Sequence, residues 1–256
     1  MDTSRISLGV PGALDVGLIV QLAELVEATG FRTLWINDTA DGDSLAGLCA
    51  AASSTTTLGL ATGVIPVDRR SGAEIVAAAE GIDPARLVLG VGSGAAQNAL
   101  ARVSEAVQVI RSASTARVLV GALGPRMRRL AAIEADGVLL NWLTPQSAVE
   151  AMGDLRREGG PSKHGAVYVR TAVEASALPA LQKEAAAYER YPSYAANFAR
   201  IGATALECTI DGSDPSVLAA RVGEYEAAVD EVVLRMIVAE PTLDDYSRFI
   251  RAVVAA

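Results

Sequence analysis

The sequence predicts an α/β fold in which a single domain of 256 residues forms a (β/α)8 barrel of the TIM type. Short runs rich in Val, Leu and Ile alternate with longer amphipathic runs rich in Ala, Leu and Glu, and eight such units follow one another. The short runs are apolar on both faces, as parallel strands covered by helices must be. Strands separated by helices pair in parallel through right-handed crossovers, so the pattern indicates a barrel.

The first five strand–helix units are assigned from apolar periodicity. The expected strands are residues 5–10, 32–37, 58–65, 87–92 and 117–122. The expected helices are residues 18–28, 44–53, 73–79, 98–111 and 126–134. Gly30 follows the first helix and ends it, as glycine commonly does after a helix.

The remaining units are assigned in the same way. The expected strands are residues 138–141, 166–173 and 231–238, and the expected helices are residues 145–157, 179–200 and 242–254. The helix 179–200 is expected to be interrupted near Pro192, and Thr242 is the expected N-cap of the last helix. Residues 201–230 carry no assignment.

An open doubly wound sheet is the alternative fold. It usually has a glycine-rich turn after the first strand, with an acidic residue about 20 positions further on. The first strand here is followed by Gly-Val-Pro-Gly at residues 9–12, which does not form that turn. GVGSGA at residues 90–95 fits the G-x-G-x-x-A spacing, but its first two glycines lie within an expected strand.

Composition excludes several classes of protein. No apolar run approaches the roughly 18 residues of a membrane span, and the N-terminus lacks the basic and apolar regions of a signal peptide. A cytoplasmic location is therefore expected. The formal net charge is −8 and basic residues occur in pairs at most, whereas nucleic-acid binding requires a basic face. We expect neither a nucleic-acid nor a membrane partner.

Cysteine and histidine are scarce. The two cysteines, Cys49 and Cys208, lie in mostly apolar stretches and are expected to be buried free thiols. The single histidine, His164, follows a Gly/Pro/Ser/Lys stretch and is expected to be a loop residue without a special role. Without a cluster of imidazole and thiolate ligands, no metal site is expected.

The expected strand ends carry glycines and amides rather than ionisable groups. These ends are Asn37-Asp38, Thr62-Gly63-Val64, Gly92-Ser93-Gly94, Gly121-Ala122-Leu123-Gly124 and Asn141-Trp142. Chemistry in a barrel gathers at the carboxyl ends of its strands. This end offers one acid, Asp38, and glycine-rich strand ends that let a flat ligand lie against the backbone. It therefore suits a redox cofactor that carries its own chemistry.

Five segments resemble the bacterial-luciferase-like flavin and deazaflavin oxidoreductases. They are LAELVEATGFRTLWIND, LGLATGVIPVDRR, RLVLGVGSGAAQN, VLVGALGPRMRRLAAIEADGVLLNW and the closing strand–helix, in the family's order over nearly the whole chain. The similarity is closest to members that use coenzyme F420, and GALGPRM…ADGVLLNWLTP is its most specific part. The resemblance implies a (β/α)8 barrel and either F420 or FMN as cofactor, because the two share a tricyclic ring, a ribityl chain and a phosphate.

The resemblance also implies roles for particular residues. Asp38 matches the acid near the ring and is the expected catalytic residue. The expected cofactor-binding residues are Gly63, Val64, Asn98, Ala122, Gly124, Pro125, Arg126, Asn141, Trp142 and Thr144. Gly63 and Val64 would back the ring, and Asn98 would bond the ring or the ribityl chain. The others would surround the ribityl chain and the phosphate, with Trp142 as a pocket wall and Trp35 in the core.

Several of these residues have a structural alternative. Asp38 is also suited to capping the turn that follows it, and Gly63 to forming a bulge in a crowded barrel. Asn98 is also suited to the N-cap of the fourth helix. The arginine pairs at 69–70 and 128–129 are typical of solvated faces.

Two departures from the family bear on function. Members that oxidise sugar phosphates or alcohols have a histidine after the acid and a glutamate in the fourth loop, where this chain has Thr39 and Ala95. The chain is also shorter around residues 80–86 and after Gly94. The resemblance implies F420-dependent hydride transfer to a small organic substrate. An FMN-dependent monooxygenase and a non-catalytic flavin- or F420-binding barrel are the alternatives, and a homodimer is left open.

Two expectations concern backbone geometry. The resemblance implies a cis peptide or a pronounced bulge between Gly63 and Val64. Pro125 suits the first position of a helix, so the amides of residues 126–128 are expected to point unpaired toward the barrel mouth. With the charge of Arg126 they would form an anion site for the cofactor phosphate, facing the 141–144 loop. An ordinary loop with a capped helix is the alternative.

Overall fold

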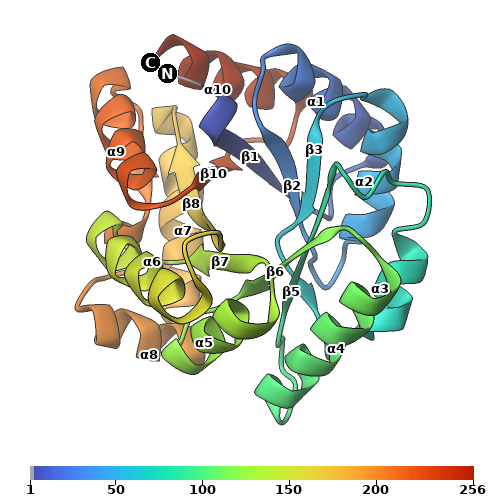
Figure 1. The fold of residues 1–256 in the computed structure, drawn as a ribbon. Helices are drawn as coiled ribbons and strands as arrows, with labels where there is room; N and C mark the ends of the chain where they lie inside the picture. The colour runs from blue at the N-terminus through green and yellow to red at the C-terminus, as the bar shows by residue number, and fades with distance from the viewer. Residues whose placement is uncertain (1–2) are drawn as a thin grey trace.

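Eight parallel strands close into a barrel in the computed structural model, which describes residues 3–256, and the helices surround it (Figure 1). The barrel strands are β1 Ile6–Pro11, β2 Thr33–Asn37, β3 Gly59–Thr62, β5 Leu87–Gly92, β6 Arg117–Gly121, β7 Gly137–Asn141, β8 His164–Ala172 and β10 Glu231–Ile237. Two further strands, β4 Ile65–Pro66 and β9 Ile210–Asp211, lie beside β5 and β8. The predicted fold class is confirmed.

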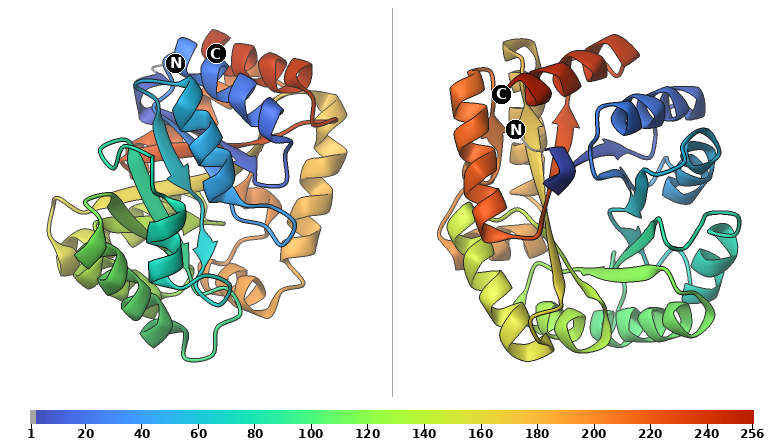
Figure 2. Two further views of the ribbon diagram at one scale, coloured as in Figure 1. Left: turned by 90° about the vertical axis from the view of Figure 1, so that its right-hand side faces the viewer. Right: turned by 45° about the horizontal axis from the view of Figure 1, so that its top comes forward.

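The helices outside the barrel are α1 Val16–Ala28, α2 Ser44–Ser54, α3 Gly72–Ala78, α4 Ala99–Ala113, α5 Pro125–Glu134, α6 Pro145–Gly159, α7 Leu178–Tyr188, α8 Pro192–Ile201, α9 Pro215–Ala228 and α10 Leu243–Ala255. Most of them begin with the capping chemistry that their sequences predict. Thr242 accepts a hydrogen bond from the amide of Asp245 at the start of α10, as expected. The two ends of the described chain lie near each other beside α10 (Figure 2).

Closure excludes the alternative open sheet. The strand order runs from β10 through β1, β2, β3, β5, β6 and β7 to β8, and β8 pairs again with β10. Ile6 of β1 is in register with Val232 of β10, and Glu231 of β10 with Ala166 of β8. Every strand of the barrel therefore has a partner on both sides, and no edge remains between the first and the last strand.

One predicted strand differs from the structure, and one helix was not predicted. The third strand, expected over residues 58–65, ends at Thr62, and pairing resumes only at β4. The expected interruption of the helix 179–200 near Pro192 is confirmed, because Pro192 begins α8 after a break at residues 189–191. Helix α9 was not predicted, although Asp214 caps it and Pro215 occupies its first position, both of which are start signals.

The core has an outer layer between strands and helices and a smaller cluster inside the barrel. The inner cluster comprises Trp35, Ala61, Val88, Leu119, Leu139, Ala166, Tyr168 and Val233. A further cluster beneath α7 and α8 comprises Trp142, Ala185, Phe198, Ala205 and Cys208. Trp35 is core, as expected, and both cysteines are free, but Cys49 is only half-buried.

A buried carboxylate joins four strands at the amino ends of the barrel. Glu231 of β10 accepts hydrogen bonds from Ser7 Oγ at 2.6 Å and Trp35 Nε1 at 2.8 Å, and His164 Nε2 lies 2.9 Å from its other oxygen. Burial raises the pKa of Glu231, but the bonds from His164, Ser7 and Trp35 outweigh it and hold the pKa below its usual value. The expectation for His164 is therefore wrong: it is the first residue of β8 and binds this carboxylate.

No helix formed by residues 3–256 is long and apolar enough to cross a membrane.

Candidate active site

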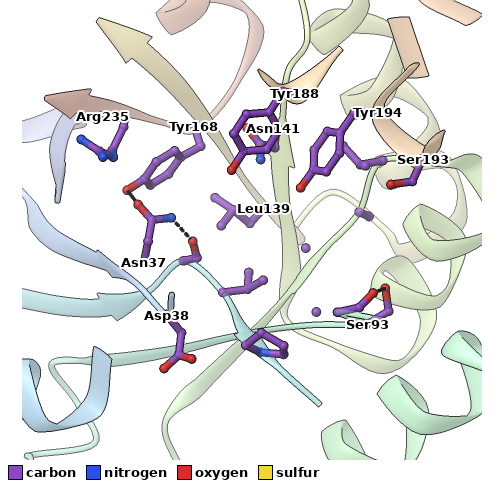
Figure 3. A pocket seen from close by; sticks show the side chains of 18 of the residues that line it. Asn37, Asp38, Ser93, Leu139, Asn141, Tyr168, Tyr188, Ser193, Tyr194 and Arg235 are labelled. Atoms are coloured by element: carbon purple, nitrogen blue, oxygen red, sulfur yellow. Dashed lines mark hydrogen bonds between the residues drawn. The ribbon is translucent and has the colours of Figure 1, made fainter. Parts of the chain in front are cut away.

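A cavity of about 620 Å³ opens at the carboxyl ends of the strands. Its walls come from the loops after β2, β3, β5 and β6, from the carboxyl-terminal parts of β7, β8 and β10, and from α7 and α8 (Figure 3). This is the end of a barrel at which ligands bind, and its volume is in the range of small-molecule sites.

Val64 forms an apolar floor that is seated on glycines. The peptide between Gly63 and Val64 is cis, which confirms the expectation for this bond. A Cβ atom at Gly92 would lie 2.6 Å from Val64 Cγ2, and one at Gly121 would lie 2.9 Å from Val64 Cγ1. The strand ends of β5 and β6 are therefore glycine because the side chain of Val64 lies across them. The result is an apolar surface, formed by Val64, that lines the cavity between two glycine strand ends.

A hydrogen-bonded chain crosses the barrel to reach this floor. The hydroxyl of Tyr168 donates to Asn37 Oδ1 at 2.6 Å, and Asn37 Nδ2 donates to the carbonyl of Gly63 (Figure 3). Gly9 makes room for the phenol, because a Cβ atom there would lie 2.3 Å from the Tyr168 hydroxyl. Burial raises the pKa of Tyr168 well above its ordinary value, so the phenol is protonated at neutral pH.

A buried arginine organises the wall opposite the floor. Arg170 is 3% exposed, and its Nε lies 2.9 Å from Glu184 Oε1 while its Nη1 donates to Asn141 Oδ1. Its guanidinium lies 4.0 Å from the ring centroid of Trp142 and 4.8 Å from that of Tyr188. Asn141 is thus held in the cavity wall, and Arg170 sets the orientation of its amide.

Asp38 lies in the cavity lining, but its carboxylate is already bound. It forms an ion pair with Arg69 and accepts a 2.8 Å hydrogen bond from Ser44 Oγ at the start of α2. The side chain is 5% exposed and points away from Asn37 and Tyr168 (Figure 3). This geometry favours the alternative interpretation of Asp38, in which it caps the segment that follows.

The structure brings six of the predicted residues together at the cavity: Asp38, Gly63, Val64, Ala122, Gly124 and Asn141. The other five lie outside its lining. Asn98 is exposed at the N-cap position of α4, with φ of 55° and no capping hydrogen bond from its side chain. Thr144 caps α6 through the amide of Ser147.

The other three residues outside the cavity lining have different surroundings. Trp142 is 1% exposed and lies behind Arg170 in the cluster beneath α7 and α8, so it is not a wall of the cavity. Pro125 is exposed at the first position of α5, and Arg126 lines a separate pocket of about 440 Å³ between α4 and α5. Arg126 does not face the barrel mouth.

The start of α5 nevertheless faces the cavity through Gly124. A Cβ atom at Gly124 would have no neighbour within 4 Å. The amide of Arg128 was expected to be unpaired, but it donates to the carbonyl of Gly124 at 3.1 Å. Arg128 Nη1 and Arg200 Nη2 both donate to the carbonyl of Leu123, at 3.2 and 2.7 Å. Two cations therefore flank the loop that was predicted to bind an anion.

Sequence reasoning missed the residues of the last strands and of α7 and α8. These are Tyr168, Arg170, Glu184, Tyr188, Tyr194 and Arg235. A signal was available for the strand residues. Tyr168 and Arg170 are two positions apart in an apolar run and so share a face, and Arg235 interrupts an apolar run. In strands otherwise buried on both faces, such residues indicate the interior of the barrel.

Comparison with known proteins agrees with this architecture. The family model described as luciferase-like monooxygenase matches residues 3–115. No curated protein matches the chain by sequence. Among solved structures, an F420-dependent secondary alcohol dehydrogenase in complex with an F420–acetone adduct is similar, with a TM-score of 0.74 and 15% identity over 98% of this chain and 99% of that one.

Two further solved structures are similar over nearly their whole length. The coenzyme F420-dependent tetrahydromethanopterin reductase from Methanopyrus kandleri has a TM-score of 0.73 and 17% identity, covering 98% of this chain and 97% of that one. The oxygenating constituent of 3,6-diketocamphane monooxygenase from Pseudomonas putida, solved with FMN, has a TM-score of 0.67 and 12% identity, covering 97% and 95%. The predicted resemblance to the luciferase-like family is therefore confirmed by the family model over residues 3–115, and the solved structures show the same fold over nearly the whole chain.

Proposed function

We propose that the protein is an oxidoreductase that uses F420 to transfer hydride to a small organic substrate. The observation that carries this proposal is the apolar side chain of Val64, which lies against Gly92 and Gly121 in the lining of a cavity of about 620 Å³. Such a surface matches the face of a tricyclic ring and offers no ionisable group of its own. The similarity to F420-dependent enzymes supports F420, and FMN is the alternative cofactor.

The residues present fit such a cofactor. The hydroxyl of Thr39 lines the cavity and is buried without a hydrogen-bond partner among residues 3–256, as is Arg128 Nε beside the loop after β6. Gly124 leaves open space where a Cβ would stand. We expect Val64 to back the ring, and Gly124, Arg128 and Arg200 to surround the phosphate. When bound, the cofactor supplies the redox chemistry.

The protein's own task is to position the substrate, exclude water and hold a proton. Tyr168 is the protonated group closest to that task, because its phenol lies in the cavity wall and burial keeps it neutral. Since Thr39 and Ala95 stand where related dehydrogenases have ionisable residues, we expect reduction of an activated double bond or an imine rather than oxidation of an alcohol.

The test is a titration of the purified protein with F420 and with FMN, followed by steady-state oxidation of the reduced cofactor in the presence of activated alkenes and cyclic imines. Saturable binding of F420 with substrate-dependent oxidation supports the proposal. Turnover only with FMN and oxygen indicates a monooxygenase instead. Binding without turnover indicates the non-catalytic barrel that the substitutions at Thr39 and Ala95 also favour, and failure to bind either cofactor contradicts the proposal.

A further inference from the structure

The cavity wall contains an arginine, Arg235, that forms no ion pair with either carboxylate of the cavity lining. Two carboxylates line the cavity, and each is paired with a different arginine: Asp38 with Arg69, and Glu184 with Arg170. Burial raises the pKa of Glu184, but Arg170 and then Arg235 outweigh it and lower the pKa, so Glu184 is ionised, with Arg170 as its ion-pair partner. Among residues 3–256, Arg235 forms no ion pair.

Arg235 is also poorly used as a hydrogen-bond donor. A guanidinium has five N–H donors, and within the described chain Arg235 donates from Nη1 to the carbonyl of Met236 at 2.5 Å. Arg170, its register partner on β8, is by contrast bound by Glu184 and Asn141 and covered by two aromatic rings. The protein therefore holds Arg170 in place, whereas most N–H donors of Arg235 have no partner among residues 3–256.

Arg235 lines the cavity on the same wall as Tyr168 (Figure 3). Its register partner on β1, Gly9, has no side chain, and the phenol of Tyr168 occupies the space there. A cation that is half-buried among apolar strands loses hydration, and an anion with matching geometry restores favourable interactions. The guanidinium of Arg235 offers donors to such a group, whereas the one O–H of Tyr168 is already donated to Asn37 Oδ1.

This position is separate from the expected phosphate site. In the order of the closed barrel, β10 lies opposite β5, and Gly124 follows β6, the neighbour of β5. An anion at Arg235 would therefore lie across the cavity from one at the start of α5. One site faces the loops of β5 and β6, and the other faces β1, β8 and β10.

We propose that Arg235 forms a subsite for the carboxylate of an organic substrate. A carboxylate accepts two parallel bonds from a guanidinium, which gives orientation as well as affinity. This inference names the substrate class and rests on the proposed function for the reaction, but the binding itself does not require the cofactor. The substrate would be an unsaturated or imino acid held by its carboxylate.

The experiment uses matched pairs of a carboxylate and its amide: acetate and acetamide, benzoate and benzamide, cinnamate and cinnamamide. Each compound is titrated into the purified protein by calorimetry, alone and in the presence of F420. We expect at least one carboxylate to bind about tenfold or more tightly than its amide, because charge-assisted bonds distinguish them. Arg235→Gln should abolish that preference, and Arg235→Lys should keep part of it.

Arg117→Gln is the matched control, because Arg117 is an exposed arginine at the amino end of β6 and far from the cavity. It should leave the preference unchanged. A second measurement separates binding from structure: Arg235→Gln should not lower the melting temperature of the ligand-free protein, since it removes an unpaired charge. If Arg235 were only structural, the substitution would lower it.

The outcomes are distinguishable from those of the proposed function. If no carboxylate of the three pairs is preferred over its amide, or if Arg235→Gln keeps the preference, the subsite is wrong even if F420 turns over. If the preference depends on Arg235 but neither F420 nor FMN binds, the subsite stands and the proposed reaction fails. A preference lost equally in Arg117→Gln would show a general charge effect and overturn the assignment.

Discussion

Gly124→Leu tests whether the start of α5 binds the cofactor phosphate. Gly124 has a φ of −96°, which any residue adopts, and a Cβ there meets no protein atom within 4 Å. The folded protein can therefore accept the side chain, and loss of glycine in the unfolded chain stabilises by about 0.4–1 kcal/mol. The leucine would occupy the space in front of the amides that begin the helix.

The expected loss of affinity follows from the bonds that the leucine displaces. A hydrogen bond to a charged group contributes about 1.5–3 kcal/mol, so loss of one or two such bonds amounts to about 3 kcal/mol. At about 1.4 kcal/mol for each factor of ten, the dissociation constant for the cofactor should rise about a hundredfold. Gly124→Ala should show a smaller increase, because its methyl group reaches less far.

The assay is a fluorescence titration with F420 or FMN at fixed ionic strength, together with the melting temperature of the ligand-free variants. Gly153→Leu is the matched control, because Gly153 is exposed in α6 and a Cβ there also meets nothing within 4 Å. It should leave affinity unchanged. A dissociation constant for Gly124→Leu within twofold of the parent, or a loss that follows a lower melting temperature, would refute the phosphate site.

Three other predictions can be checked directly. Tyr168→Phe should lower kcat for alkene or imine reduction by at least about tenfold while changing cofactor affinity little, because it removes a proton donor; a pH profile of kcat measures this, and an unchanged kcat contradicts it. No sugar phosphate or secondary alcohol should be oxidised with F420, since Thr39 and Ala95 cannot take the proton; alcohol oxidation that depends on Asp38 would show the reverse. Three backbone amides, chiefly that of Thr57, lower the pKa of Glu27 to about 2 against the raising effect of burial, so its stabilisation is present above pH 4.5 and is lost as pH falls toward 2. In urea unfolding, Glu27→Gln should be about 1–2 kcal/mol less stable than the parent at pH 6 and closer to it at pH 3. If the difference in free energy of unfolding is the same at both pH values, the ionised Glu27 carboxylate is not its source.

The sequence predicted the strand–helix alternation because each strand is buried on both faces and each helix has one apolar face. Those signals are local, and they located the strand ends that form half of the cavity. The family resemblance added the Gly63–Val64 bond, which the structure confirms as cis. Composition alone does not predict that bond, because neither residue type requires it.

The residues that were missed depend on contacts across the barrel. Tyr168 and Asn37 are 131 positions apart in the chain, and their hydrogen bond exists only because β1, β2, β8 and β10 become neighbours on closure. Arg126 was assigned to the mouth because it begins a helix, but the direction of its side chain is set by packing between α4 and α5. Periodicity places a residue on an element without showing which neighbour that element faces.

The long-range contacts of Glu231 bear on how the barrel folds during synthesis. Its carboxylate ties together Ser7, Trp35 and His164, and its bond to Ser7 spans 224 positions. Since β1 emerges from the ribosome long before β10, the first strand has to wait unpaired on one side until synthesis is nearly complete. A chain that stops before residue 231 leaves β1 and β8 as open edges that can pair with other chains. Premature termination should therefore yield aggregates rather than a smaller working barrel.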